Sequence, residues 1–148
     1  MKRLTLLLVV FCAGAISLFA QDSPKPYHDG PVWQIQYIHA KPGMEDRYLR
    51  YLSGDWKQEM EMMKKNGFIL DYKVITTESH NPQDFNVILM AEYKDLATME
   101  GNKDKAEAAA LQQFGGRQKI ESGYEDRSSY RDALATRVGR EIILEPKK

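Results

Sequence analysis

Histidine is the side chain best suited to carry protons near neutral pH, and the sequence contains three, His28, His39 and His80. None of them is spaced as a metal-binding pair on a helix, so no metal site is predicted, and any cofactor stays unknown. His28 and His80 lie in turn-rich segments, where we expect them to be solvated. His39 closes an alternating apolar run and is the weak candidate for a catalytic proton carrier. The more ordinary interpretation is a strand-end polar residue, whose replacement by alanine costs little stability.

Aromatic side chains suggest a second kind of chemistry, the binding of a small molecule. They recur at helical spacing between residues 44 and 66, and such residues ordinarily fill a core. The functional alternative is a flat apolar pocket between helix and sheet, suited to a planar organic molecule, with phenol hydroxyls at its edge. The candidate ligand-binding residues are Tyr37, Tyr48, Tyr51, Trp56 and Arg47.

Arg47 and Arg50 stand where they could bind a carboxylate at the entrance of that pocket, although such residues more often form a solvated helix face. Gly115-Gly116 ends a helical pattern rather than opening one, so no phosphate-binding loop is predicted. The serines lack a nucleophile-elbow motif. The motifs therefore leave it uncertain whether the chain is an enzyme.

The elements that position these residues follow the order strand, helix, strand, strand, helical region, strand. An extended lead-in at 21–31, rich in proline, precedes them. Apolar residues at spacings of three or four predict one long helix, in which Gly54 allows close packing or marks a kink. The predicted strands are 32–39, 68–77, 85–93 and 138–144, and the predicted helices are 44–66, 102–114 and 118–129, with a turn at 96–99 capped by Asp95.

This order predicts an α+β domain over 32–145, a ferredoxin-like four-stranded antiparallel sheet with helices on one face. The third strand is apolar on both faces, so the face without helices needs a second layer. A second copy of the chain is the expected layer, packed sheet against sheet. A charge at Leu89 is therefore expected to dissociate the dimer or abolish soluble expression.

Three segments carry a resemblance to a known superfamily: the strand at 32–37, the Pro-Gly turn with its Glu-rich helix start at 41–49, and the strand at 87–93. In this layout the chain resembles the dimeric α+β barrel superfamily, and most closely its secreted bacterial members without assigned activity. The resemblance implies ferredoxin-like protomers whose sheets close a shared barrel in a homodimer.

Three functions remain open at this point. The first is a non-catalytic or small-ligand-binding homodimer. The second, by analogy with relatives that act on phenols, quinones or haem, is a small cofactor-independent or haem-related oxygenase or isomerase acting on a planar organic molecule. The third is a periplasmic interaction module that uses the polar segment 101–137.

The first twenty residues read as a secretory signal peptide, with a cationic start, an apolar run and small residues. Cleavage is expected after Ala20 or, alternatively, after Ala15; an uncleaved anchor and a lipoprotein cysteine at Cys12 are further alternatives. The protein is therefore expected to be periplasmic or secreted and not membrane-bound after signal removal. Cys12 is the single cysteine, so disulfides are not expected in the mature chain. Its near-neutral charge gives no reason to expect nucleic acid as a partner.

Overall fold

A computed structural model of the chain describes residues 25–81 and 83–146. The predicted signal peptide, its two cleavage sites and Cys12 lie outside these residues. The elements, in chain order, are β1 (Tyr27–Ala40), α1 (Glu45–Tyr51), a π-helical segment η1 (Leu52–Trp56), α2 (Lys57–Lys65), β2 (Asp71–Thr76), β3 (Val87–Tyr93), α3 (Leu96–Gly101), α4 (Lys103–Phe114), α5 (Arg117–Ser128) and β4 (Arg131–Leu144).

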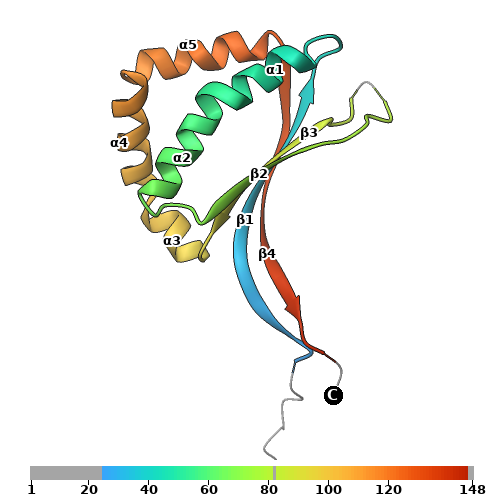
Figure 1. Cartoon of the computed structure of the whole chain (residues 1–148), viewed down its shortest axis with the longest axis vertical. Helices are drawn as coiled ribbons and strands as arrows, with labels where there is room; N and C mark the ends of the chain where they lie inside the picture. The colour runs from blue at the N-terminus through green and yellow to red at the C-terminus, as the bar shows by residue number, and fades with distance from the viewer. Residues whose placement is uncertain (1–24, 82, 147–148) are drawn as a thin grey trace, which may run out of the picture.

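The four strands form one antiparallel sheet in the order β2-β3-β1-β4. The helices lie together on one side of this sheet (Figure 1). This arrangement confirms the predicted fold class, a ferredoxin-like four-stranded antiparallel sheet with helices on one face. No helix within the described residues is long and apolar enough to cross a membrane.

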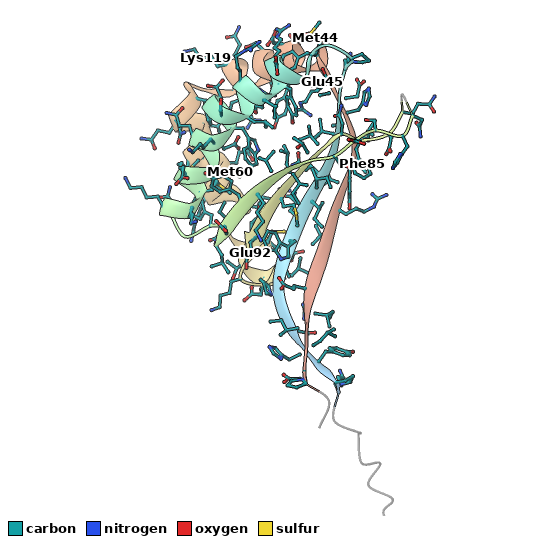
Figure 2. The ribbon with its side chains drawn as sticks, turned by 45° about the vertical axis from the view of Figure 1, so that its right-hand side comes forward. Met44, Glu45, Met60, Phe85, Glu92 and Lys119 are labelled. Atoms are coloured by element: carbon teal, nitrogen blue, oxygen red, sulfur yellow. The ribbon has the colours of Figure 1, made fainter. Side chains whose placement is uncertain are left out.

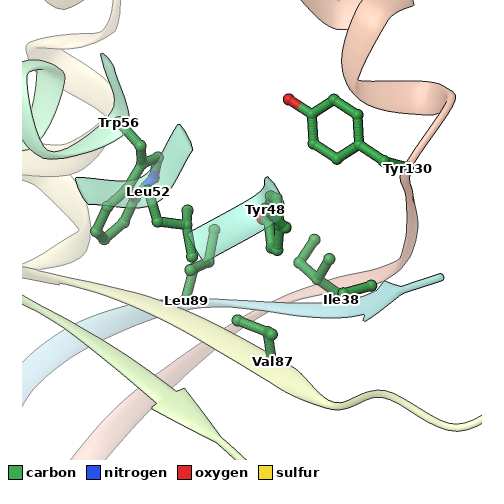
Figure 3. Packing of buried hydrophobic residues seen from close by; sticks show 8 residues of the cluster. Ile38, Tyr48, Leu52, Trp56, Val87, Leu89 and Tyr130 are labelled. Carbon is green, nitrogen blue, oxygen red and sulfur yellow. The ribbon is translucent and has the colours of Figure 1, made fainter. Parts of the chain in front are cut away.

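The core lies between the sheet and the first helical segment (Figure 3). Tyr48 and Leu52 come from the helices and pack with Ile38 of β1 and Leu89 of β3, all at least 95% buried. Burial of this apolar surface is the main force that holds the helices on the sheet. Leu89 therefore belongs to the monomer core, so of the two expected outcomes of a charge at Leu89 the loss of soluble expression is the one that fits, and the substitution does not report on the dimer.

The opposite, helix-free face of the sheet is also apolar. Cross-strand partners share a face, and the register pairs Ile35 with Met90 and Tyr37 with Ile88. These residues alternate along their strands with the core positions, so their side chains stand on the side away from the helices. Figure 2 draws the side chains on both faces of the sheet. The Tyr37 ring makes an edge contact with Phe85, with 4.9 Å between ring centroids. The predicted two-sided apolar character of β3 is thus present in the fold.

Strands β1 and β4 are longer than their apolar patterns indicate. β1 begins at Tyr27, so the second half of the predicted extended lead-in is paired strand, and β4 begins at Arg131 instead of 138. Residues 27–29 pair with β4 alone and form a two-stranded ribbon beyond β2 and β3 (Figure 1). Each strand supplies the other with backbone hydrogen-bond partners, which side-chain alternation does not reveal.

The long helix predicted at 44–66 is present as three consecutive segments, α1, η1 and α2. Gly54 lies in the π-helical segment, and a Cβ built there would meet no atom within 4 Å. Close packing is therefore not the reason for this glycine. The helices predicted at 102–114 and 118–129 are confirmed as α4 and α5, and Asp95 caps α3 by accepting a hydrogen bond from the Thr98 amide.

Candidate functional site

The largest cavity described in the molecule, about 680 Å³, lies between the first helical stretch and the α4–α5 pair. Figure 1 shows these two groups of helices facing one another above the sheet. Tyr51 and Glu59 line the cavity from one side. The other side is lined by apolar and aromatic side chains of α4 and α5, namely Leu111, Phe114, Ile120 and Tyr124.

Local sequence explains why this space stays open. The α4 residues 108–110 are all alanine, so the helix presents small side chains, and Ala110 lines the cavity. Gly115 ends α4 in the left-handed conformation with φ of 77°, which lets the chain turn into α5. An ion pair between Glu107 and Arg117, with 2.6 Å between oxygen and nitrogen, connects the two helices.

A smaller cavity of about 400 Å³ adjoins the first. The two share five lining residues, Tyr51, Asp55, Gly123, Asp126 and Arg127. Arg47 and Arg50 line the smaller cavity. Together the two cavities make one groove with an apolar and an arginine-rich part.

Arg127 stands where the two parts meet. Its guanidinium lies 4.8 Å from the centroid of the Tyr51 ring and 4.4 Å from that of the Tyr124 ring. A guanidinium over an aromatic face is attracted by the ring quadrupole. A Cβ on Gly123 would come within 3.0 Å of the Arg127 Nη1 atom, so the glycine leaves room for the guanidinium.

A pair of tyrosines lies between the groove and the core, where Tyr51 lines both cavities and Tyr48 is buried in the core cluster. Tyr48 and Tyr51 are stacked, with 5.9 Å between ring centroids. Burial raises the pKa of Tyr48 to about 12, against the opposing effect of Arg131 and Arg127. Burial likewise raises the pKa of Tyr51. Both phenols therefore stay protonated at neutral pH and offer O–H donors, and the buried Tyr48 hydroxyl has no hydrogen-bond partner among the described residues.

Glu59 is the titratable acid of the cavity whose environment is most unusual. Burial raises the pKa of its carboxyl group, and the positive charge of Arg127 partly offsets this. Burial raises the pKa of Tyr93 as well, and Glu59 adds to that effect. Glu59 thus takes up a proton more readily than an exposed glutamate does, and in that form it can donate a hydrogen bond.

The structure separates the residues predicted to bind a ligand. Tyr51 lines the large cavity, and Arg47 lines the adjoining one, where its Nη2 atom is 2.9 Å from an Asp126 oxygen. Tyr48 and Trp56 are buried in the core cluster. Tyr37 stands on the helix-free face of the sheet, because its register partner Ile88 alternates with core positions. The cavity lies between helices instead of between helix and sheet.

His39, the weak catalytic candidate, is 8% exposed and lies at the end of β1. Its Nδ1 atom is 2.7 Å from the main-chain oxygen of Asp84. The described cavities do not have it among their lining residues. His39 thus lies at a strand end, as the more ordinary interpretation has it, and its ring is buried and hydrogen-bonded there.

Glu59 and Arg127 are cavity residues that the sequence alone did not single out. Glu59 carried a weak signal, since it follows Trp56 by three residues and precedes Met60 on a helix whose apolar side faces inward. Arg127 carried none, because it lies in a uniformly polar stretch. No group of three or more metal-ligating side chains occurs within the described part of the chain.

Comparison with known proteins gives a likeness of fold. No protein-family model matches the sequence, and no curated protein matches it either. A NIPSNAP family protein of unknown function from Agrobacterium tumefaciens has a similar structure, with a TM-score of 0.51, 11% identity, and coverage of 80% of this chain and 92% of that chain.

Two further solved structures are similar at lower scores. HapK from Hahella chejuensis has a TM-score of 0.49 and 9% identity, covering 74% of this chain and 91% of its own. A dimeric ferredoxin-like protein from an uncultured marine organism has a TM-score of 0.49 and 8% identity, covering 82% and 93%. At such identities the likeness concerns the fold alone, and the chain has the ferredoxin-like α+β fold.

Proposed function

We propose that the protein binds a small planar organic molecule in the cavity between its two helical groups. The observation that carries this proposal is the cavity itself, whose volume of about 680 Å³ lies within the range of small-molecule sites. Its α4–α5 wall supplies apolar and aromatic side chains, and charged side chains such as Glu59, Glu107 and Arg127 surround them. Apolar and aromatic surface beside polar groups that fix orientation is typical of sites for organic ligands.

We further propose that the protein acts as a homodimer joined through the helix-free faces of two sheets. Ile35, Tyr37, Ile88 and Met90 place apolar surface on this face, which water covers in a lone chain. The ribbon formed by 27–29 and β4 supports the same proposal, because an isolated two-stranded ribbon is marginally stable in water. A second copy of the chain would cover both the apolar face and the ribbon.

Export of the protein is part of the proposal and rests on the sequence. The charge, apolar run and small residues of the first twenty positions are those of a signal peptide. Mass spectrometry of the protein recovered from its native cells is expected to find a chain that begins at Gln21, or at Ile16 if cleavage follows Ala15. Recovery of an intact N-terminus would contradict export by cleavage.

Filling the cavity tests ligand binding. Ala110→Phe places a ring in the space, so binding of naphthol, a planar probe, is expected to weaken at least about tenfold, since apolar burial of the probe is lost. Isothermal titration calorimetry measures the affinity. Ala108→Phe is the matched control, because Ala108 is exposed on the same helix and does not line the cavity. Equal affinity in the two variants, or no saturable binding to the unsubstituted protein, would refute the proposal.

A further inference from the structure

We propose that the ligand of this cavity carries a carboxylate group, and that Arg127 binds it; this inference rests on the proposed function. The position of Arg127 is the first observation. Its guanidinium is shared by the apolar cavity and the arginine-rich one. A molecule with a planar apolar body and an acidic end would therefore place the body against α4 and α5 and the acid at Arg127.

The second observation is the lack of a counter-ion at Arg127. Among the described residues, no carboxylate lies within ion-pair distance of its guanidinium, and its buried Nε atom has no hydrogen-bond partner. Its contacts are instead the ring faces of Tyr51 and Tyr124. Because the side chain is partly buried, water compensates its charge incompletely. An anionic ligand would supply the missing partner.

Two other arginines that line this groove form ion pairs. Arg47 pairs with Asp126 at 2.9 Å and Arg117 pairs with Glu107 at 2.6 Å. Those two guanidiniums and those two carboxylates are thus already neutralised. Arg127 differs from them by being unpaired and by stacking on two rings.

Asp55, Glu59 and Asp126 are acids that line the large cavity together with Arg127. None of these three lies within the 4.0 Å range of an ion pair with the Arg127 guanidinium, and Asp126 is paired with Arg47. Burial raises the pKa of Glu59 and so disfavours its charged form. When Glu59 is protonated, it would offer a second hydrogen-bond donor to a carboxylate held by Arg127.

Guanidinium and carboxylate form paired, charge-assisted hydrogen bonds that a neutral alcohol cannot reproduce. The test compares two probes of the same ring system, naphthoate and naphthalenemethanol, by isothermal titration calorimetry at neutral pH. Naphthoate is expected to bind the unsubstituted protein at least about tenfold more tightly. A third probe, naphthylmethylamine, carries the opposite charge and is expected to bind no better than the alcohol.

Arg127→Gln is expected to remove the preference for the acid over the alcohol. Lys105→Gln is the control for the loss of one positive charge, because Lys105 is exposed on α4 and does not line the cavity, and it should keep the preference. Arg127→Lys retains the positive charge without the guanidinium fork, and part of the preference should return. Circular dichroism on heating checks that each variant is folded.

The outcomes distinguish this inference from the function on which it rests. If the alcohol or the amine binds the unsubstituted protein as tightly as naphthoate, or if Lys105→Gln removes the preference as completely as Arg127→Gln, the assignment of a carboxylate to Arg127 is refuted and the cavity remains a ligand site. If none of the three probes binds, the proposed function fails as well. The comparison of probes on the unsubstituted protein decides the question even where a variant does not fold.

Discussion

The carboxyl group of Glu59 is held in a setting that disfavours its charge. It lines the cavity between the helices, and burial raises its pKa above 4.5, the value of an ordinary glutamate. A raised pKa means that the folded protein keeps this proton over a pH range in which the unfolded chain has lost it. The contribution of Glu59 to stability is therefore most favourable at low pH and becomes unfavourable as the pH rises through its folded-state pKa.

Replacing Glu59 by glutamine tests this sign. Glu59→Gln removes the ionisation. The free energy of unfolding of this variant, minus that of the unsubstituted protein, should therefore increase as the pH rises from about 4 to about 8. Urea titration at several pH values, followed by circular dichroism, measures the difference. Glu78→Gln, at an exposed loop residue, controls for the loss of one negative charge. Parallel stability curves for Glu59→Gln and the unsubstituted protein would contradict the prediction.

His39 lies at a strand end, and its buried ring makes one hydrogen bond to the main chain. The ring is buried, and its Nδ1 atom lies 2.7 Å from the Asp84 carbonyl oxygen. His39→Ala leaves a cavity and an unpaired buried carbonyl, so it is expected to reduce the free energy of unfolding by about 1–3 kcal/mol. Urea unfolding measures this loss, and His80→Ala, at an exposed ring, should change stability by less than about 0.5 kcal/mol. A negligible loss for His39→Ala would show that this bond does not stabilise the fold.

At the scale of the elements, the glycines within helices have different causes. Gly54 in η1 faces open space, since a Cβ there would meet nothing within 4 Å. Gly123 in α5 instead leaves room for the Arg127 guanidinium, which a Cβ would approach within 3.0 Å. Glycine costs conformational entropy in any helix, but at Gly123 it also preserves the geometry of the cavity.

Gly54→Ala is therefore expected to stabilise the protein by about 0.5–1 kcal/mol, because alanine loses less backbone freedom on folding and meets no steric obstacle here. The midpoint of urea unfolding measures the gain. Gly123→Ala is the matched comparison, and it should gain less or lose stability because the new methyl group displaces the guanidinium. An equal gain at both positions would mean that Arg127 moves aside freely.

At the scale of the whole molecule, the sheet has an apolar surface on each side. Leu89 and Ile38 face the helices and are buried, while Ile88 and Met90 face away from them. The long β1–β4 ribbon extends this second surface beyond the rest of the sheet (Figure 1). Both features follow from one arrangement, in which a single layer of helices covers a sheet that is apolar on two faces.

Ile88→Asp tests the proposed dimer. A substitution at Leu89 cannot test it, because Leu89 lies in the monomer core. It places a charge in the centre of the helix-free face, and burial of an unpaired charge between two sheets is strongly unfavourable. Analytical ultracentrifugation is expected to find a folded monomer in place of the dimer, or a dissociation constant raised at least about a hundredfold. Val138→Asp, at an exposed residue on the other face of the same sheet, should leave the dimer intact. An unsubstituted protein that sediments as a monomer would refute the dimer itself.

Local patterns in the sequence determined the order of the elements and the fold class. Alternation between Trp33 and Tyr37 marked β1, and the apolar spacing from Met44 marked the first helical stretch, because both periodicities arise from backbone geometry within one element. The Asp95 cap was readable for the same reason, since its hydrogen bond spans three residues.

Contacts between distant residues were decided by the tertiary structure alone. No local periodicity encodes how elements pack. Packing decides the face on which Leu89 stands, the pairing of 27–29 with β4, and the approach of Arg127 to Tyr51. Periodicity says that a strand has two faces but not which one the helices cover. The cavity is formed between helices that are distant in the chain, so it belongs entirely to this second kind of information.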